Sequence, residues 1–488
     1  LMVNNICIVG SGTAGSVAAL IYRAAFPTAS IKIISSSDIG IVGVGEGSTE
    51  HWKMFMNAVD LPVGEVLSET MGTHKIGIRF VNWTTHTPDY FHSVSSAEKM
   101  NWNGIYTLYS GLNQRGKLLT NSIGRHGVLE GKVPASNPHE SVNQFHFDTF
   151  KLNEYLRKKC IQKNIKLIEG EVVDVKQDPF SGFITSVVLS DGSEISSNFF
   201  IDASGFRRIL MTKIGNTKWN SFKNHLPMDS AIAFPTPLPE DSVIMPFTSA
   251  TAKSSGWMWE IPTQERRGNG YVFCSDFMTE DEAIQEASSH IGYQIEPARV
   301  FKFDPGCLDK VWDKNVIAIG LCSAFVEPLE ATSIGSTIQQ IFGSIKYLSS
   351  FNGNPISAQK YNESVKVMMD NLESMIALHY ISDREDTEFW KYAKTMERPD
   401  YLNNLLDIWS VSTPTDHDIP INGFNLFYAP HFWHVAQGQG VLSSSISSDT
   451  IKSLNLDQFI SDMIWEKKRM KFAEPLTDHF ESLEKIRL

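Results

Sequence analysis

The sequence predicts an α/β fold that opens with a strand, a glycine-rich turn, a helix and a second strand. Apolar residues at 6–9 precede the glycine-rich segment 10–15, and apolar residues then recur at the three- and four-residue spacing of a buried helix face. Residues 31–34 supply the second strand pattern and complete a βαβ unit over residues 3–35. Such a unit is the building block of an open parallel sheet.

Further elements can be predicted from the same periodicities. Strand and helix patterns alternate up to about residue 350. Beyond it the pattern is mainly helical, with many aromatic residues and loops. In chain order we expect a helix from residue 150, strands at 165–168 and 172–175, a hairpin whose Asp191-Gly192 turn joins 184–189 to 195–202, a strand at 316–319, and a helix with apolar residues at 334, 338, 341, 345 and 348.

Composition restricts the class of protein. The chain of 488 residues has 42% hydrophobic and 20% charged residues, which is ordinary for a globular enzyme. A formal charge of -12 argues against nucleic-acid binding, because such proteins gather cations to displace phosphate counterions. The first strand begins too early for a signal peptide, and no run approaches the ~20 apolar residues of a membrane helix, so a cytoplasmic location without membrane contact is expected.

Cysteine usage gives no sign of a metal site. The five cysteines are scattered and form no CxxC pair, so we expect reduced, structural thiols and no bound metal. The sequence is compatible with a homo-oligomer but does not specify one. The cysteines are Cys7, Cys160, Cys274, Cys307 and Cys322.

The glycine-rich turn has the GxGxxG pattern in the context that gives it meaning, between a strand and a helix. Gly10 permits the turn, Gly12 lets the backbone approach a pyrophosphate, and Gly15 lets helix and strand pack closely. The amides of Thr13 and Ala14, at the helix start, would face the phosphates. The alternative is a glycine-rich turn without a ligand.

The acidic residue that usually binds the ribose is missing from its expected place. Ser35 stands at the end of the second strand, where an acid is expected, and Asp38 is a substitute three residues later. A serine hydroxyl can bind a ribose hydroxyl but brings no charge. Adenosine binding is therefore expected to be looser than in the usual pattern.

FAD is a better prediction than NAD. The segment 201–205 resembles the strand-end motif of flavoprotein monooxygenases, and Asp202 lies within it. Only one GxGxxG is present, so there is no separate nicotinamide domain. The alternative for the Asp202 side chain is a turn or helix cap.

Four segments together resemble the flavin-dependent tryptophan halogenase family over nearly the whole chain. They are the glycine turn, Gly43-Val44-Gly45-Glu46-Gly47-Ser48, Trp257-Met258-Trp259-Glu260-Ile261-Pro262, and Phe325-Val326-Glu327-Pro328-Leu329-Glu330-Ala331-Thr332. The WxWxIP match is the most specific. The resemblance implies a flavin monooxygenase-type FAD-binding core with an interleaved, mostly helical substrate-binding subdomain.

The resemblance also implies a reaction. Reduced FAD, delivered by a separate flavin reductase, and O2 oxidise a halide to hypohalous acid, which travels inside the protein to a lysine beside an indole- or phenol-type substrate. Lys75 stands where that lysine is expected and, as an ammonium or an amine, would hydrogen-bond the oxidant or carry the halogen as a haloamine. The alternative interpretation of Lys75 is a solvated charge on the protein surface.

Glu330 corresponds to the family's catalytic glutamate. A carboxylate near Lys75 would polarise the oxidant or accept the ring proton. Alternatively, Glu330 is an acidic residue favoured at a helix start.

Thr332 and Ser333 are the expected halide contacts, because the following helix offers unpaired amides to an anion. The family usually has Glu-Ser-Thr-Gly here, whereas this chain has Glu330-Ala331-Thr332-Ser333. The change alters the space around the halide. We therefore expect bromide or iodide to be used as well as chloride.

Other parts of the site follow from the resemblance with less detail. Trp257 and Trp259, two residues apart on a strand, point to one side and form the wall between flavin and substrate, or simply a core stripe. Further flavin contacts are Gly45, Glu46 and Gly320, and the expected substrate contacts are Phe91, His92 and Trp433, each with packing as its alternative.

We expect residues 1–350 to form the FAD-binding core, with inserted substrate-facing segments at about 80–145 and 215–300, and residues 351–488 to form the helical subdomain.

The alternative activity is FAD-dependent aromatic hydroxylation. Hydroxylases carry a Gly-Asp pair near the third flavin motif, whereas Gly320 is followed by Leu321. A non-enzymatic flavin-binding protein is the third alternative, and it leaves Lys75, Glu330 and WxWxIP unexplained.

Overall fold

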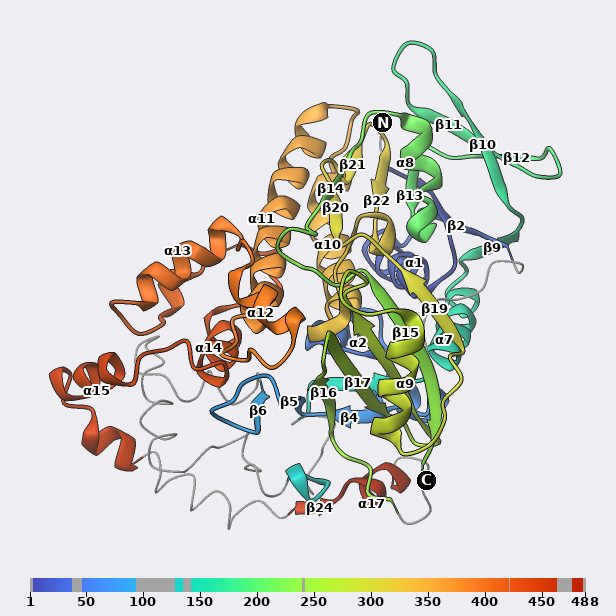
Figure 1. Cartoon of the computed structure of the whole chain (residues 1–488). Helices are drawn as coiled ribbons and strands as arrows, with labels where there is room; N and C mark the ends of the chain where they lie inside the picture. The colour runs from blue at the N-terminus through green and yellow to red at the C-terminus, as the bar shows by residue number, and fades with distance from the viewer. Residues whose placement is uncertain are drawn as a thin grey trace.

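A computed structural model has two large sheets with helices packed beside them (Figure 1). The predicted mixture of helices and sheets is confirmed. The structure describes residues 3–36, 46–93, 128–134, 142–238, 242–420, 422–462 and 476–485.

The first sheet has six strands and contains the predicted βαβ unit. All its neighbouring pairs are parallel except β21 with β22. Helices α1 (Thr13–Ala25), α7 (Thr149–Gln162) and α10 (Thr332–Leu348) adjoin it, as the helix patterns predict. In sheet order the strands are β21 (Trp312–Asp313), β22 (Val316–Ala318), β13 (Phe199–Asp202), β1 (Asn5–Val9), β2 (Ser30–Ser35) and β9 (Lys166–Glu169).

The turn between β1 and α1 requires glycine at Gly10 and at Gly15. Gly10 has a φ of +112°, which favours glycine. A Cβ on Gly15 would lie 2.0 Å from the carbonyl oxygen of Gly10, so only glycine allows this approach of helix and strand. A Cβ on Gly12 would have no atom within 4 Å. The turn is therefore closed at Gly10 and Gly15 and open at Gly12.

The predicted strand 195–202 is wrong as a single element. It divides into β12 (Glu194–Ser196), which completes a hairpin sheet with β10 (Val172–Gln177) and β11 (Ile184–Leu189), and β13, which enters the parallel sheet beside β1. Ser197 and Asn198 lie between the two halves and hydrogen-bond to Asn5 at the start of β1. These polar contacts end the hairpin and set the register of β13.

The second sheet has seven strands and separates two apolar cores. Trp257 faces the helices of the carboxyl-terminal third, whereas Met258 faces α9 (Glu280–Ile291) on the opposite side. Its only parallel pair is β16 with β5. In sheet order the strands are β19 (Arg299–Lys302), β15 (Ser230–Pro237), β18 (Arg266–Phe273), β17 (Gly256–Pro262), β16 (Phe247–Ala252), β5 (Gly77–Val81) and β6 (Asp89–His92).

Several small elements complete the fold. A three-stranded sheet of β3 (Glu46–Gly47), β8 (Gln144–Phe147) and β4 (Thr73–Lys75) carries Lys75, and its strand β4 lies near β16 of the second sheet. The other elements are α2 (His51–Ala58), α3 (Val63–Glu69), β7 (Lys132–Pro134), η3 (Gly205–Arg207), α8 (Ile209–Ile214), β14 (Trp219–Ser221), β20 (Gly306–Leu308), η4 (Gly320–Cys322), β23 (Ala324–Phe325), η5 (Pro328–Glu330), η6 (Asp416–Asp418), β24 (Leu476–Asp478) and α17 (His479–Glu484).

The carboxyl-terminal third is mainly helical, as predicted. Its long helix α11 passes from one core to the other: Tyr361 packs with the first sheet, whereas Met375 packs with the second. The division into domains at about residue 350 stays a prediction. The helices are α11 (Pro355–His379), α12 (Glu388–Thr395), α13 (Asp400–Trp409), α14 (Ala429–Gly438) and α15 (Ser444–Ser453).

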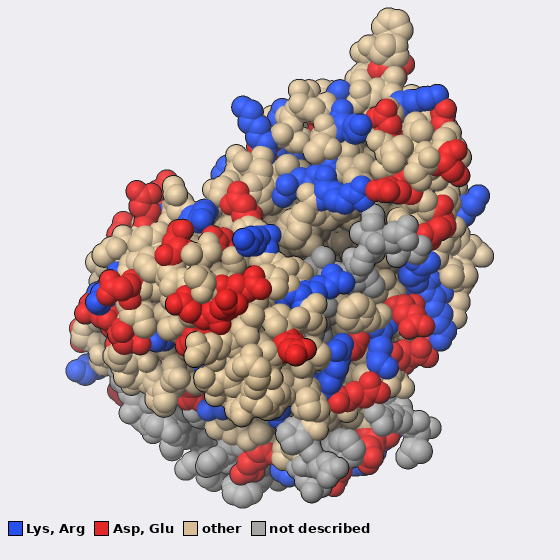
Figure 2. Space-filling model, turned by 45° about the vertical axis from the view of Figure 1, so that its right-hand side comes forward, with Lys and Arg blue, Asp and Glu red and all other residues tan. Residues whose placement is uncertain are grey.

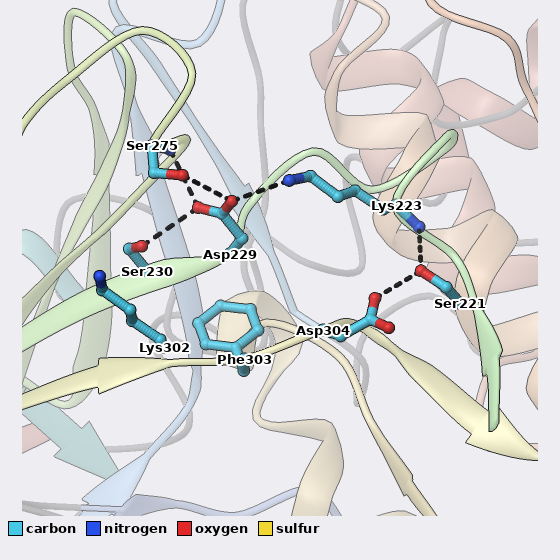
Figure 3. A pocket seen from close by; sticks show the side chains of 8 residues that line it. All are labelled: Ser221, Lys223, Asp229, Ser230, Ser275, Lys302, Phe303 and Asp304. Atoms are coloured by element: carbon cyan, nitrogen blue, oxygen red, sulfur yellow. Dashed lines mark hydrogen bonds and ion pairs between the residues drawn. The ribbon is translucent and has the colours of Figure 1, made fainter.

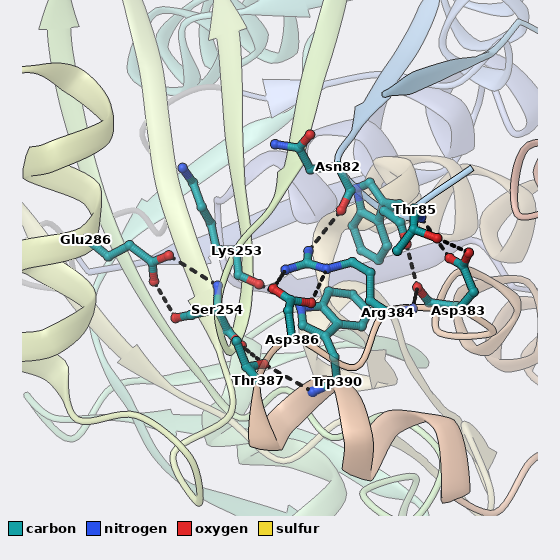
Figure 4. A network of polar contacts seen from close by, with 12 residues as sticks. Asn82, Thr85, Lys253, Ser254, Glu286, Asp383, Arg384, Asp386, Thr387 and Trp390 are labelled. Carbon is teal, nitrogen blue, oxygen red and sulfur yellow. Dashed lines mark hydrogen bonds and ion pairs between the residues drawn. The ribbon is translucent and has the colours of Figure 1, made fainter. Parts of the chain in front are cut away.

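A polar network fixes the chain directly after α11 (Figure 4). Arg384 donates two hydrogen bonds to Asp386 and one of 2.8 Å to the carbonyl oxygen of Asn82, and its guanidinium lies 4.5 Å from the ring centre of Trp390. Trp390 in turn donates to the carbonyl oxygen of Lys253. The end of α11 is thereby held against the second sheet.

Charges of both signs share the surface, and the thiols are buried. On the face shown in Figure 2, Lys and Arg are interspersed with Asp and Glu. All five cysteines are free and buried, as predicted. Within the described ranges, no helix is long and apolar enough to cross a membrane, and no three potential metal ligands gather into a site.

The two glycine positions give a matched stability test. Gly15→Ala is expected to lower the free energy of unfolding by at least the ~1 to 3 kcal/mol typical of overpacking, because its methyl group would overlap a backbone carbonyl. Gly12→Ala places a methyl group in open space and should leave the stability of the flavin-free protein close to that of the wild type. Thermal unfolding of both variants checks this, and equal melting temperatures would contradict the description of the turn.

Candidate active site

The predicted catalytic pair, Lys75 and Glu330, lines one small buried cavity. The cavity lies where β4, β5 and β6 meet η5 and α14. Polar and charged groups dominate its lining, and apolar contact comes from Ile78 and Phe427. The lining residues are Thr49, Glu50, Lys75, Ile78, His92, Gln144, Glu330, Phe427 and His431.

Lys75 is a buried cation, not a surface charge. Its side chain is about 1% exposed, and Nζ donates a 2.8 Å hydrogen bond to the carbonyl oxygen of Ser48. Burial lowers the pKa of Lys75 to about 8, although the carboxylates of Glu330 and Glu50 oppose this fall. The burial of Lys75 excludes the alternative that this lysine is a solvated surface charge.

A neutral histidine lies beside Lys75. Thr73 donates a hydrogen bond to the carbonyl oxygen of Pro262, so it must accept from Nδ1 of His146 at 2.9 Å. Burial and the charge of Lys75 hold the pKa of His146 well below its usual value. Nε2 of this neutral ring therefore accepts from the hydroxyl of Thr248, at 2.9 Å.

Glu330 lies between two histidines. Its Oε2 is 2.8 Å from Nδ1 of His92, and its Oε1 is 2.7 Å from Nε2 of His379. Burial would raise the pKa of Glu330, but its interactions with His92 and His379 outweigh burial and hold this pKa well below the usual range. Glu330 is therefore a carboxylate whose two oxygens are both engaged.

A second acid and histidine lie on the far wall of the cavity. Nε2 of His431 is 3.7 Å from Oε1 of Glu50. Nδ1 of His431 accepts a hydrogen bond from the backbone amide of Tyr428, so the ring proton is on Nε2, directed toward Glu50. Burial lowers the pKa of His431 to about 4. This histidine is a neutral donor.

The start of α10 has the features expected of an anion site. Ala331, at the cap position, has a φ of +54° and its side chain provides no cap, so the first amides of the helix lack a side-chain acceptor. The hydroxyl of Thr332 is buried, and no described residue is its hydrogen-bond partner. The carbonyl oxygen of Ser333 accepts from Ser336 and Thr337.

Two of the residues predicted to hold a flavin lie close to the glycine turn. Gly320 comes next to the turn, because a Cβ on it would be 2.8 Å from that of Ala14. Ser35 ends β2, directly after Ile34, whose carbonyl oxygen accepts from the amide of Gly10. Glu46, on β3, is half-buried, and one of its carboxylate oxygens is buried and unpartnered by any described residue. Burial raises the pKa of Glu46 to about 7. Gly45 and Asp38 lie outside the described residues.

The side chain of Asp202 is a cap, which was the structural alternative. One oxygen accepts from Ser204, and the other accepts from the amides of Leu210 and Met211 at the start of α8. Both oxygens of the Asp202 carboxylate are thus engaged by groups of residues 204–211. The backbone after Asp202 still shapes the nucleotide turn, because a Cβ on Gly10 would lie 2.2 Å from the carbonyl oxygen of Ala203.

The two tryptophans lie on one face of β17, as their spacing predicts. Their ring centres are 6.1 Å apart. The indole of Trp259 lies against the backbone at Gly270, where any Cβ would be 2.1 Å from the ring. Trp257 and Tyr380 both donate to Oε2 of Glu327, whose pKa burial raises to about 8. This protonated carboxyl ties the tryptophan strand to the end of α11.

The predicted substrate residues fall into two groups. His92 lines the cavity and contacts Glu330. Phe91, its neighbour on β6, packs edge-on against Phe247 in a separate apolar core. Trp433 is buried in the core beneath the second sheet and does not line the cavity.

Another hollow lies on the surface and has a different character (Figure 3). Its acids bind neighbouring groups: Asp229 accepts from Lys223 at 3.0 Å and from Ser275 at 2.7 Å, and Asp304 accepts from Ser221. These contacts hold loops together at the edge of the second sheet. The buried cavity at Lys75 is the stronger candidate for chemistry.

Sequence reasoning missed several members of the site. His379, Glu50, His431 and Gln144 lie in segments with no motif of their own. The signal for His379 was weak: it falls among apolar residues near the end of a long helical pattern, which marks a buried histidine but not its partner.

The geometry and the comparisons lead to one class of protein. The family model described as tryptophan halogenase matches residues 5–451. A tryptophan 6-halogenase of Streptomyces toxytricini is 30% identical, over 85% of this chain and 86% of the relative. A tryptophan 7-halogenase of Lentzea aerocolonigenes is also 30% identical, over 85% of this chain and 84% of the relative.

A solved structure agrees with these sequence matches. A flavin-dependent halogenase from Xanthomonas campestris superposes with a TM-score of 0.86 at 27% identity and covers 100% of this chain and 99% of its own. The protein is thus an oxidoreductase of the flavin-dependent halogenase class, and the chain belongs to the tryptophan halogenase family.

The burial of Lys75 predicts a pH-dependent stability difference. A fall of its pKa from 10.5 to about 8 corresponds to roughly 3 kcal/mol, because the folded state disfavours the charged form. Lys75→Met should therefore be more stable than the wild type at pH 7. The unfolded lysine binds a proton between about pH 8 and 10.5 when the folded one does not, so the advantage should shrink over this range.

Urea unfolding of both proteins at pH 7, 9 and 10 measures this difference. The difference in free energy of unfolding between the two proteins is compared, because groups that titrate alike in both proteins cancel from it. A variant that is less stable than the wild type at pH 7, with a gap independent of pH, would show that burial of this charge is not costly.

Proposed function

We propose that the chain halogenates an electron-rich aromatic substrate of the indole or phenol type, with reduced FAD, O2 and a halide as reactants. The observation that carries the proposal is that Lys75 and Glu330 line one buried cavity. A hydroxylase needs no such lysine. Tryptophan is the substrate named for two of the relatives and is the first compound to test.

The nucleotide end of the protein would hold FAD. Gly12 leaves space for a pyrophosphate, with the amides of Thr13 and Ala14 at the helix start, Gly320 beside Ala14 and Ser35 at the end of β2. Glu46 is a further predicted contact. Gly45 and the backbone at Asp202 complete the predicted contacts. Bound in reduced form, FAD would supply the electrons with which O2 and a halide become hypohalous acid.

The halide would sit at the start of α10. Thr332 offers a buried hydroxyl, and with Ser333 it offers backbone amides, which are donors suited to an anion. Bromide and iodide would be accepted as well as chloride. Trp257 and Trp259 would form the wall between this end and the substrate, so that hypohalous acid moves within the protein.

At the substrate end, Lys75 would hold the oxidant. Its ammonium donates to the oxygen of hypohalous acid and makes that oxygen a better leaving group, so that the halogen is directed to the ring carbon. The negative charge of Glu330 opposes Lys75 and stabilises positive charge that develops on the substrate. His92 and segments of residues 351–488 would surround the substrate.

The direct experiment supplies the protein with FAD, NADH, a flavin reductase and each halide in turn, and analyses products from a panel of indoles and phenols by mass spectrometry. We expect a monohalogenated product from the wild type and at least a 100-fold loss for Lys75→Ala, with hypohalous acid still captured by a soluble 1,3-diketone. Omission of the reductase should stop both reactions, because the chain has no second nucleotide motif.

Two outcomes would contradict the proposal. A hydroxylated product without halogen would favour the aromatic hydroxylase. A Lys75→Ala variant that halogenates at the wild-type rate would remove the lysine from the reaction.

A further inference from the structure

The hydrogen bonds around Glu330 determine where protons lie in the site. Nδ1 of His379 is 2.8 Å from the carbonyl oxygen of Met375, and a carbonyl can only accept, so Nδ1 carries a proton. A second proton bridges Nε2 of His379 and Oε1 of Glu330 across 2.7 Å. Whichever atom this proton is bonded to, Oε1 already faces a proton and has little capacity to accept another.

The other oxygen of Glu330 fixes the tautomer of His92. Oε2 is an acceptor wherever that proton lies, so Nδ1 of His92 donates the 2.8 Å hydrogen bond to Oε2. A neutral His92 then has its lone pair on Nε2. This nitrogen is buried, and no described residue is its hydrogen-bond partner. Buried ring nitrogens are normally satisfied, so an open one beside a cavity points to a ligand or a reacting group.

The geometry points to His92 as the base that removes the ring proton from the halogenated substrate. This inference rests on the proposed function. His92 lines the same cavity as Lys75, where the oxidant would be held. Glu330 and His379 are then positioning residues: they hold His92 in the Nδ1-protonated tautomer, and Glu330 stabilises the imidazolium that forms. A carboxylate behind a histidine performs both tasks in other enzymes.

The alternative acceptors in the cavity are weaker. His431 accepts at Nδ1 from a backbone amide and is a donor at Nε2. Burial would raise the pKa of Glu50, but its interactions with His431 and His51 hold this pKa below its usual value, and a carboxylate is a weaker base than an imidazole. Gln144 and Thr49 are neutral. Among the described lining residues, His92 is the one whose ring nitrogen is buried with a lone pair that no described residue engages.

The step balances without a further reactant. A ring carbon attacks the halogen of hypohalous acid, the carbon–halogen bond forms, and the oxygen–halogen bond breaks with its electron pair on oxygen. A proton from the Lys75 ammonium converts that oxygen to water. Nε2 of His92 then takes the ring proton, and the electrons of the carbon–hydrogen bond restore the aromatic ring. Transfer of the proton from His92 to Lys75 returns the site to its first state.

Two amide variants separate the candidates. His92→Asn keeps a donor near the position of Nδ1 but removes the lone pair at Nε2, and Glu50→Gln removes the competing carboxylate. Each is supplied with reductase, FAD, NADH and bromide, together with tryptophan or indole, whichever the wild type halogenates. Product formation is measured with ordinary and ring-deuterated substrate, and oxidant formation with the 1,3-diketone trap.

We expect His92→Asn to lose ~100- to 10,000-fold in product formation, as is typical for removal of a general base, while hypohalous acid still forms. Slow proton removal should also make the deuterated substrate react more slowly, whereas the wild type and Glu50→Gln should show no such isotope effect. If His92→Asn fails to fold, His92→Gln is measured in its place.

Three results would overturn the inference: a near wild-type rate for His92→Asn, a loss without an isotope effect, or an isotope effect confined to Glu50→Gln. If the wild type itself halogenates no compound, the proposed function fails. If the wild type halogenates and one of these three results is obtained, only the assignment of His92 fails.

Discussion

The buried carboxylate of Glu330, held between His92 and His379, is the interaction on which the rest of the site depends. The three residues come from η5, β6 and α11, so the contact joins the segment before α10, the edge of the second sheet and the carboxyl-terminal helices. An ionised carboxylate is costly to bury unless it is paired and hydrogen-bonded. The two histidines supply these contacts, and Lys75 adds a compensating charge across the cavity.

Much of the surrounding fold serves this arrangement. The network at Arg384 and the protonated carboxyl of Glu327 both fix the end of α11, which carries His379. The small sheet of β3, β8 and β4 brings Lys75 into the same cavity and buries it beside neutral His146. Burial lowers the pKa of Lys75 to about 8, so its ammonium gives up a proton more readily than that of a surface lysine.

Local patterns in the sequence were sufficient for the βαβ unit, the helices α7 and α10 and the tryptophan face of β17, because these features depend on periodicity and glycine sterics. The meeting of Lys75 and Glu330 in one cavity was expected only from the family resemblance. The split of residues 195–202 was not predictable, because it depends on contacts of Ser197 and Asn198 with the distant Asn5. His379 was missed for the same reason, since its partner Glu330 lies 49 residues earlier in the chain.

The central claim is that the site holds its protons in one defined arrangement, with His92 protonated at Nδ1 and unprotonated at Nε2. Nitrogen-15 NMR of the protein labelled at histidine measures this directly, because protonated and bare ring nitrogens differ widely in chemical shift; comparison with His92→Asn assigns the signals. The account predicts a bare Nε2 and a protonated Nδ1 for His92 at neutral pH, with a protonated Nδ1 for His379. A proton on Nε2 of His92 in the resting protein would contradict it.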